Sequence, residues 1–478
     1  MLKKYITAVL LLCSCFVNAQ RDKEEMNNDP LFQSAYDKFE KKLYREAYED
    51  YTTYLHKKPN DANALYNRGL CSYEETDYKS AIRDFKNSIS LGRKRSDAYY
   101  MKGLCEFLDK DNNTALKDFD TSLIYKPNDG KALCYKGATL NELKNYNEAL
   151  KNLDMAEKEI SDYEPVYYYR TLTKYYLKDY EGSLMDCNKA LSLKDYYDTH
   201  FWKGLNLIEL KRYKEGITEY DTVIAHNKKY AKAYYNRGIA WLDLGEYEKS
   251  ISDNTKCLEI EPSFQKAFYN RALCLFYQQK YKEAEPDFNA AVGLGNPDYK
   301  YYCWRGANYY MLKKDELALL DLNKSIELKN DYETSYYYRA LVKYVLADDK
   351  GCIEDCSKAL ALQKKYDTYY TRALSKYVLK DYNGAIEDHT EALKLKTDYS
   401  SAYLERGVCY YMLEKDDQAM TDFNQAIKLN PSSGKAFYYR GKSKKYKNDL
   451  IGSCEDLKTA KSLGYTYADD EIIKNGCK

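Results

Sequence analysis

The 478-residue chain lacks most of the features on which catalysis or nucleic-acid binding would depend. It has only four histidines, which are scattered, and it contains no phosphate-binding loop and no motif that pairs a nucleophile with a base. Its 75 lysines and arginines are balanced by 74 aspartates and glutamates, so no basic excess is available to neutralise phosphates. The sequence therefore predicts a non-enzymatic protein with no cofactor and no nucleic-acid partner.

Linkers and long apolar runs are also scarce. The chain has eight prolines, and no segment rich in proline, glycine or serine divides it. Several domains would be possible at this length, but nothing marks a boundary between them. The run from Ile6 to Leu12 is too short to span a membrane, and no later segment approaches the required length. We expect one long array without a transmembrane span.

The first residues resemble an export signal. Lys3 and Lys4 precede the apolar run, and Val17-Asn18-Ala19 forms a small-residue cleavage pattern before Gln20. Residues 1–19 are thus predicted to be a signal peptide and residues 20–27 a polar N-terminal segment, which places the mature protein in the periplasm, at the cell surface or outside the cell.

A lipid anchor is the alternative. Leu12-Cys13-Ser14-Cys15 loosely resembles a bacterial lipobox ending at Cys15, although Cys13 is atypical there. The cleavage pattern at Ala19 favours the soluble product, and the anchored form at Cys15 stays open.

The feature that organises the rest of the chain is a small residue that recurs every 33 or 34 positions, thirteen times. A second small residue follows each of these anchors by twelve positions, from Ala47 to Ser453. Repetition with this period is typical of a solenoid, in which each unit buries its apolar face against its neighbours. The anchors are Ala35, Gly69, Gly103, Gly137, Thr171, Gly204, Gly238, Ala272, Gly306, Ala340, Ala373, Gly407 and Gly441.

Each repeat is predicted to be two antiparallel helices. Residues 233–244 and 247–260 both show helical spacing of apolar residues, and Gly245-Glu246 separates them. We interpret the anchor and its partner as the point where the helices cross, which requires small residues. The anchors Gly69, Gly103, Gly137, Gly204, Gly238, Gly306, Gly407 and Gly441 are accordingly structural.

This pattern resembles the tetratricopeptide repeat (TPR). The small anchor, the aromatic residue nine positions later and the later small residues match that family over residues 28–464. The resemblance implies an all-α fold, a right-handed α-solenoid superhelix of about thirteen repeats that binds proteins along its inner surface. Residues 465–478 are expected to cap it, with a short helix at 468–474.

Opposite charges accompany the anchors. The residue before the anchor is basic in twelve repeats, and the residue fifteen positions after it is acidic in twelve, with Asn152 as the exception. We predict a ladder of pairs such as Arg305–Asp321, either within a repeat or to the next one. A track for a charged ligand is the alternative.

The cysteines are predicted to be core residues. Cys71, Cys105, Cys274 and Cys409 all lie two positions after an anchor, and equivalent residues of adjacent repeats should be about 10 Å apart, too far for a disulfide. Cys477, in the terminal segment, is the least constrained candidate for a bond. The nearest approach to a metal-ligand set is Cys352, Cys356 and His389, and repeat spacing places His389 too far away. No metal site is predicted.

Tyrosine is the outlier of the composition, with 56 residues against 13 Phe and 3 Trp. Positions three before, one after and four after the anchor share one stripe of the first helix, the stripe that faces the groove in TPR arrays. The aromatic residues there leave no place for a clamp that holds a C-terminal carboxylate. The candidate groove residues are Tyr66, Tyr73, Tyr100, Tyr168, Tyr175, Tyr235, Tyr269, Tyr310, Tyr337, Tyr344, Tyr370, Tyr377 and Tyr411.

Two functions fit this stripe. Tyrosine suits a recognition surface, so the first is a cell-envelope scaffold that binds a protein or peptide segment in the groove. The second is a carbohydrate-binding protein of the surface or periplasm that uses the same rows. The tyrosines could instead serve mainly to pack helix on helix.

Overall fold

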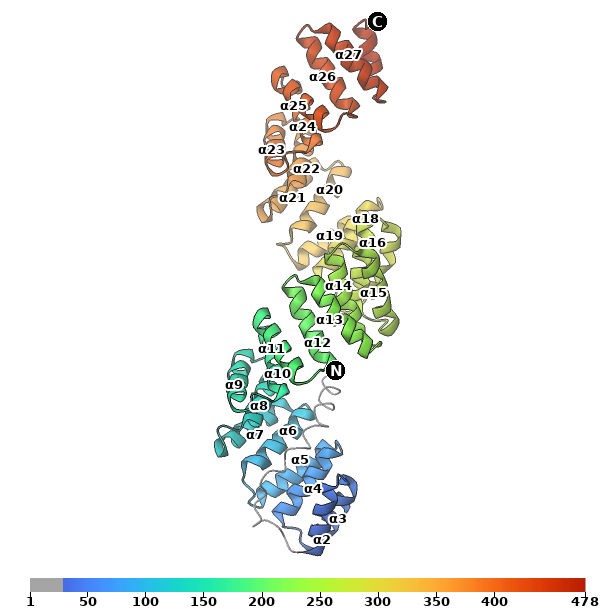
Figure 1. Ribbon diagram of the computed structural model, residues 1–478. Helices are drawn as coiled ribbons and strands as arrows, with labels where there is room; N and C mark the ends of the chain where they lie inside the picture. The colour runs from blue at the N-terminus through green and yellow to red at the C-terminus, as the bar shows by residue number, and fades with distance from the viewer. Residues whose placement is uncertain (1–28, 478) are drawn as a thin grey trace. The chain divides into compact units, whose positions relative to one another are not determined.

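The computed structural model describes residues 29–477, and this part of the chain is built from helices with no strand (Figure 1). The predicted signal peptide (1–19), the candidate lipidation site at Cys15 and the polar segment 20–27 lie outside these residues. The structure divides into two compact units, of which the first ends at Glu246 and the second begins at Tyr247.

Unit 1 holds six helix pairs and one further first helix. Its helices are α2 (Pro30–Glu40), α3 (Tyr44–Lys57), α4 (Ala62–Glu74), α5 (Tyr78–Ser90), α6 (Ser96–Leu108), α7 (Asn112–Tyr125), α8 (Gly130–Glu142), α9 (Tyr146–Glu159), α10 (Glu164–Tyr176), α11 (Tyr180–Leu193), α12 (Tyr197–Glu209), α13 (Tyr213–His226) and α14 (Ala231–Asp243).

Unit 2 begins with a second helix, continues through six pairs and ends on a short helix. Its helices are α15 (Tyr247–Ile260), α16 (Gln265–Tyr277), α17 (Tyr281–Gly293), α18 (Tyr299–Met311), α19 (Asp315–Leu328), α20 (Glu333–Val345), α21 (Asp349–Leu362), α22 (Tyr366–Val378), α23 (Tyr382–Leu395), α24 (Ser400–Met412), α25 (Asp416–Leu429), α26 (Gly434–Tyr446), α27 (Leu450–Ser462) and α28 (Ala468–Lys474). The helix predicted at 468–474 is present as α28.

The turn between paired helices has a constant local cause. Seven positions after the anchor, the residue of each turn has a positive φ, in the left-handed region. In one repeat this residue is a glycine, Gly245, and in the others it is a non-glycine residue such as Lys42 (φ 62°) or Ala347 (φ 59°). The next residue is often an aspartate that caps the second helix: Asp348 accepts a hydrogen bond of 3.0 Å from the Gly351 N–H. Turn and cap together end one helix and start the next within three residues.

The anchors lie where paired helices touch, as predicted. A Cβ added to Gly137 would be 2.6 Å from Leu153 Cγ and 3.2 Å from the carbonyl oxygen of Ala149, which is the small partner twelve positions later. The same close approach recurs at Gly69, Gly103, Gly204, Gly306, Gly407 and Gly441. Any larger side chain would separate the two helices at these points.

The predicted charge ladder is confirmed, and its pairs form within a repeat. Arg305 donates through Nε (2.7 Å) and Nη2 (2.8 Å) to the two carboxylate oxygens of Asp321. Its Nη1 reaches back to Asn289 Oδ1 (3.2 Å) in the preceding repeat, so one guanidinium joins two repeats. The rungs of this form are Arg68–Asp84, Arg170–Asp186, Arg271–Asp287, Arg305–Asp321, Arg339–Asp355, Arg372–Asp388, Arg406–Asp422 and Arg440–Asp456.

Unit 1 contains the irregular rungs. Lys102 replaces arginine and contacts both Asp118 and Glu106. Lys203 pairs with Glu219 at 2.8 Å, and Lys136, opposite Asn152, turns to Asp120 of the preceding repeat instead. These basic side chains pair with carboxylates of the described residues, which favours the ladder over the charged ligand track.

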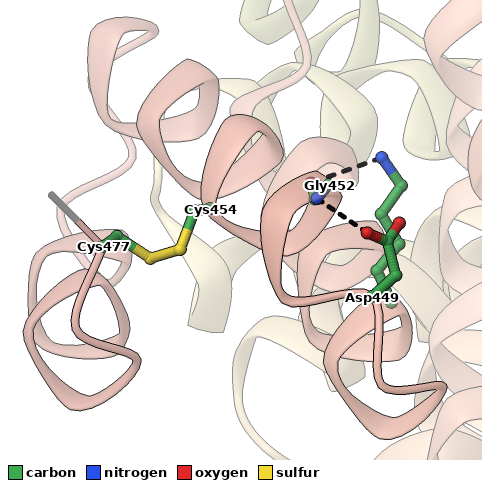
Figure 2. The surroundings of a disulfide bond; sticks show 5 residues. Asp449, Gly452, Cys454 and Cys477 are labelled. Atoms are coloured by element: carbon green, nitrogen blue, oxygen red, sulfur yellow. Dashed lines mark hydrogen bonds between the residues drawn. A yellow bond between two sulfur atoms is a disulfide. The ribbon is translucent and has the colours of Figure 1, made fainter.

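The C-terminal segment is tied back by a disulfide. Cys477, the candidate from the sequence, bonds to Cys454 on α27 with a Cα–Cα distance of 5.4 Å, and Figure 2 shows this bridge beside the Asp449 cap of the same helix. The other ten cysteines of residues 29–477 are free and buried, which confirms that they are core residues.

Candidate functional site

The candidate groove tyrosines all lie on first helices, and none of them is fully exposed. Tyr66, Tyr73 and Tyr168 are buried. The other ten are half-buried, namely Tyr100, Tyr175, Tyr235, Tyr269, Tyr310, Tyr337, Tyr344, Tyr370, Tyr377 and Tyr411.

In unit 1 the aromatic residues of consecutive first helices pack directly on each other. The ring of Tyr135 on α8 lies 6.1 Å from that of Phe107 on α6 and 6.1 Å from that of Tyr169 on α10. Asn141 donates a 3.0 Å hydrogen bond to the carbonyl of Tyr169 and accepts a 2.8 Å bond from Thr173. One continuous core cluster therefore runs from Tyr66 to Leu172 across four repeats.

In unit 2, half-buried tyrosines form an unbroken row at one of the groove positions. Tyr310, Tyr344, Tyr377 and Tyr411 occupy one position in four consecutive repeats, and each keeps part of its ring exposed. The aliphatic row beside them is half-buried at Leu341 and Leu374 and buried at Ala307 and Val408. The core clusters of unit 2 are small and lie within a pair or between neighbouring pairs.

The tyrosines of unit 2 are hydrogen-bond donors at neutral pH. Burial raises the pKa of Tyr310, Tyr344 and Tyr377 above the ordinary value of 10.0. A neutral phenol with an apolar ring and a polar tip can cover an apolar group and still donate to a carbonyl or carboxylate.

The structure adds two rows that the sequence analysis did not include. Two positions before the anchor, Trp304 lies between Phe276 (5.4 Å between ring centroids) and Tyr338 (6.0 Å), and so joins three repeats. Five positions after the anchor, the last residue of the first helix is an exposed apolar residue throughout repeats 8–13 of unit 2. Reading every position against the 34-residue period would have found both rows.

The residues considered for metal binding are core residues. Cys352, Cys356 and His389 are all fully buried, and within residues 29–477 no three His, Cys, Asp or Glu side chains are grouped as ligands. Burial lowers the pKa of His389 to about 3, and neither ring nitrogen has a hydrogen-bond partner in the described residues. His389 stands where other repeats have Phe85, Phe288 or Phe423.

Comparison with known families identifies the repeat. A family model described as a tetratricopeptide repeat matches residues 231–264 and 400–433, and a second model of the same description matches residues 32–86. The chain is a tetratricopeptide-repeat protein. The resemblance and the all-α solenoid predicted from the anchors are thus confirmed, while no curated protein matches this TPR protein.

A solved structure agrees with this fold. A chain of the APC/C hetero-tetramer Cut9–Hcn1 superposes with a TM-score of 0.50, covers 87% of this TPR protein and 96% of its own length, and is 15% identical. A tetratricopeptide repeat protein from Parabacteroides merdae is also similar, with a TM-score of 0.42 and 19% identity over 52% of this chain and 98% of that one. Yeast Tom70 has a TM-score of 0.36 and 15% identity over 87% of this chain and 95% of its own. At these identities the likeness concerns the fold alone.

The family sets a general role. Tetratricopeptide repeats mediate protein–protein interaction, and their solenoids are typically non-enzymatic scaffolds. In residues 29–477 of this TPR protein no helix is both long and apolar enough to cross a membrane, since even the longest have 14 residues.

Proposed function

We propose that the protein is a non-enzymatic scaffold of the cell envelope and that it binds a segment of a partner protein on unit 2. The binding surface is the aromatic face of unit 2, which we define as the half-buried residues one and four positions after the anchor in repeats 9–12. These are Tyr310, Leu341, Tyr344, Leu374, Tyr377 and Tyr411.

The observation that carries this proposal is the half-open row of Tyr310, Tyr344, Tyr377 and Tyr411. Tyrosine brings a large contact area at a low cost in side-chain entropy, and four such rings in consecutive repeats form a long surface. The charge ladder lies on another side of the first helix. Its basic residue, one position before the anchor, is about 200° around the helix axis from the aliphatic residue one position after the anchor.

The disulfide and the N-terminal sequence support a place in the envelope. Structural disulfides persist in oxidising compartments, and Cys454–Cys477 is one. Mass spectrometry of the mature protein tests this location. A chain that begins at Gln20 supports export as a soluble protein, an acylated Cys15 supports the anchored form, and an uncleaved chain with reduced Cys454 contradicts both.

Binding by the aromatic face can be tested by capture of partners from the envelope fraction. We expect the Tyr344→Ala/Tyr377→Ala variant to retrieve its protein partners at least about tenfold less than the wild type, a loss of about 1.4 kcal/mol or more. Tyr125→Ala, at an exposed tyrosine of α7, is the matched control and should retrieve them as the wild type does. Equal retrieval by all three proteins, or capture of glycans in place of protein, would show the assignment to be wrong.

A further inference from the structure

Unit 2 carries an exposed apolar row beside its aromatic face. In each of repeats 8–13 the first helix ends on a large apolar side chain that is between 39 and 67% exposed. In four of these repeats the next residue is leucine, and Leu346 and Leu379 are themselves exposed. The apolar row consists of Tyr277, Met311, Val345, Val378, Met412 and Tyr446.

The fold does not require apolar residues at this position. In unit 1 the equivalent residue is acidic in five of seven repeats, as at Glu74, Glu142 and Glu209. A polar residue therefore ends the first helix equally well, and six consecutive exposed apolar residues in unit 2 form a patch of the kind that marks an interaction surface.

The row is continuous with the aromatic face. Val345 follows Leu341 by four residues and Val378 follows Leu374 by four, so each pair lies on one side of its helix. A partner segment on the aromatic face would also cover the apolar row.

Two lysines close the row at its C-terminal end. Lys442 and Lys445 lie one and four positions after the last anchor, where the other repeats, apart from Asn141, have aliphatic or aromatic residues. The Lys442 ammonium lies 5.4 Å from the ring centroids of both Tyr411 and Tyr438. This places a positive charge at the end of the aromatic face.

These two lysines differ from the other lysines around them. Lys435, Lys444 and Lys447 pair with Glu405, Asp456 and Asp417. Lys442 and Lys445 are half-buried, and no carboxylate of the described residues lies within ion-pairing distance of either. Their position calls for an acidic group from outside this part of the chain.

The spacing between residues of the apolar row indicates the backbone conformation of the partner segment. First helices of neighbouring repeats are about 10 Å apart, so the six residues cover about 50 Å. A polyproline-like segment rises about 3.1 Å per residue and turns once in three, so every third side chain falls on one face about 9.3 Å further on. A straight α-helix of that length could not follow a row whose repeats are each rotated relative to the last.

We propose that unit 2 binds an extended segment of a partner protein that carries an apolar side chain at every third position along the apolar row and Asp or Glu side chains over Lys442 and Lys445. This inference rests on the proposed function, because it names the chemistry of the segment that the scaffold binds. The chain's own residues 20–28 do not fit the description, since Met26 is their one large apolar residue.

Labelled synthetic peptides and the full chain test the proposal by fluorescence anisotropy. The probe is a peptide of about 16 residues with leucine at every third position, proline and serine between, and three aspartates at one end. One comparison peptide has the same composition with leucine at every second position, a second ends in lysines, and a third is a helix-forming sequence with leucine at heptad spacing. We expect the probe to bind at least about tenfold more tightly than each of them.

Variants locate the binding. Val345→Glu/Val378→Glu places at this position of unit 2 the acidic residue type that is common in unit 1. We expect it to weaken probe binding about tenfold or more, because the bound peptide would bury two carboxylates without a counter-charge. Lys442→Glu/Lys445→Glu should remove the preference for the aspartate end over the lysine end. Met185→Glu, at a 71% exposed methionine of α11, is the matched control and should change nothing.

The outcomes separate this proposal from the one on which it rests. Equal binding of all peptides, tighter binding of the heptad peptide, or no effect of the Val345/Val378 substitutions would overturn the extended-segment proposal. If the peptides fail while Tyr344→Ala/Tyr377→Ala still loses its captured partners, the scaffold function stands and only the chemistry of its partner is wrong.

Discussion

Unit 1 and unit 2 use the same repeat but stabilise the contact between successive repeats in different ways. In unit 1, rings such as Tyr135 and Tyr169 fill the space between consecutive first helices, and the charge ladder is irregular, with lysines at Lys102, Lys136 and Lys203. In unit 2, six arginines in succession pair with aspartates, and the aromatic rows stay half open.

This difference shows how contacts on one side of the first helix can leave the opposite side available for binding. An arginine that bonds to its own repeat and to the preceding one holds successive repeats from one side, as Arg339 does with Asp355 and Asn323. The opposite side of the first helix then need not supply all of the packing between repeats. In unit 2 that side carries the exposed apolar row in six consecutive repeats, whereas in unit 1 Tyr176 is the one exposed apolar residue at that position and five of the seven repeats have an acid there.

Removing one aromatic ring from the same position in each unit tests whether the two units depend differently on aromatic packing. Tyr169→Ala deletes a buried ring from the continuous core and should cost about 3–5 kcal/mol of stability. Tyr338→Ala removes a half-buried ring and should cost about 1–3 kcal/mol, because part of its surface already faces water. Hydrogen exchange resolved by helix measures both, since repeat arrays can open locally. Equal losses in the two units would contradict the proposed difference.

The ladder provides the second test. Arg305→Leu leaves Asp321 nearly buried without its partner and should cost about 2–3 kcal/mol, less than for a fully buried pair because Arg305 is partly exposed. The double variant with Asp321→Leu should cost less than the sum of the single variants by more than about 1 kcal/mol. Lys136→Met, at the rung without an aspartate, should cost about 0–1 kcal/mol. Strictly additive losses at Arg305 and Asp321 would argue against the ladder.

His389 allows one core position of unit 2 to be changed to the phenylalanine that both units have there in other repeats, as at Phe85 and Phe423. His389→Phe restores the residue type of Phe85 and removes two buried nitrogens without partners, so stability near pH 7 should rise by about 1–3 kcal/mol. The effect should grow in acid. The pKa of His389 is lowered to about 3, below the unfolded value of 6.5, so the unfolded state takes up its proton first and stability falls between pH 6.5 and about 3. Denaturant titrations at pH 7 and pH 5 compare the two proteins, and an unchanged difference would refute this account.

The acids at the helix ends of unit 1 should give the smallest effect. Burial raises the pKa of Glu74 to about 7, above the ordinary value of 4.5. The folded state therefore holds the proton of Glu74 more tightly than the unfolded state does, and the free energy of unfolding falls as pH rises from 4.5 through 7. Glu74→Gln should therefore stabilise unit 1 by about 1 kcal/mol above pH 7, after allowance for solvent screening at this half-buried group, and should have little effect at pH 4.5. Exposed Glu209→Gln is the control. A gain of equal size at both pH values would point to packing rather than charge.

Much of the architecture could be predicted because it repeats. A side chain placed at one point of a 34-residue period meets the same neighbours in every repeat, so small anchors indicate crossing helices and paired charges such as Arg305 and Asp321 indicate contact. The period also assigned Cys274 and Cys409 to the core and left Cys477 as the residue able to bond.

Other properties were decided by the tertiary structure alone. Tyr168 and Tyr337 stand at the same position of the period, yet one is buried and the other half open. Burial at that position depends on side chains from two or three consecutive repeats at once, including the rows at Tyr169 and Trp304, and no single repeat contains that information. The tertiary structure also decided which cysteine bonds to Cys477 and which apolar residues of unit 2 stay exposed. Both depend on distances between chain segments, and only the packing of the helices sets those distances.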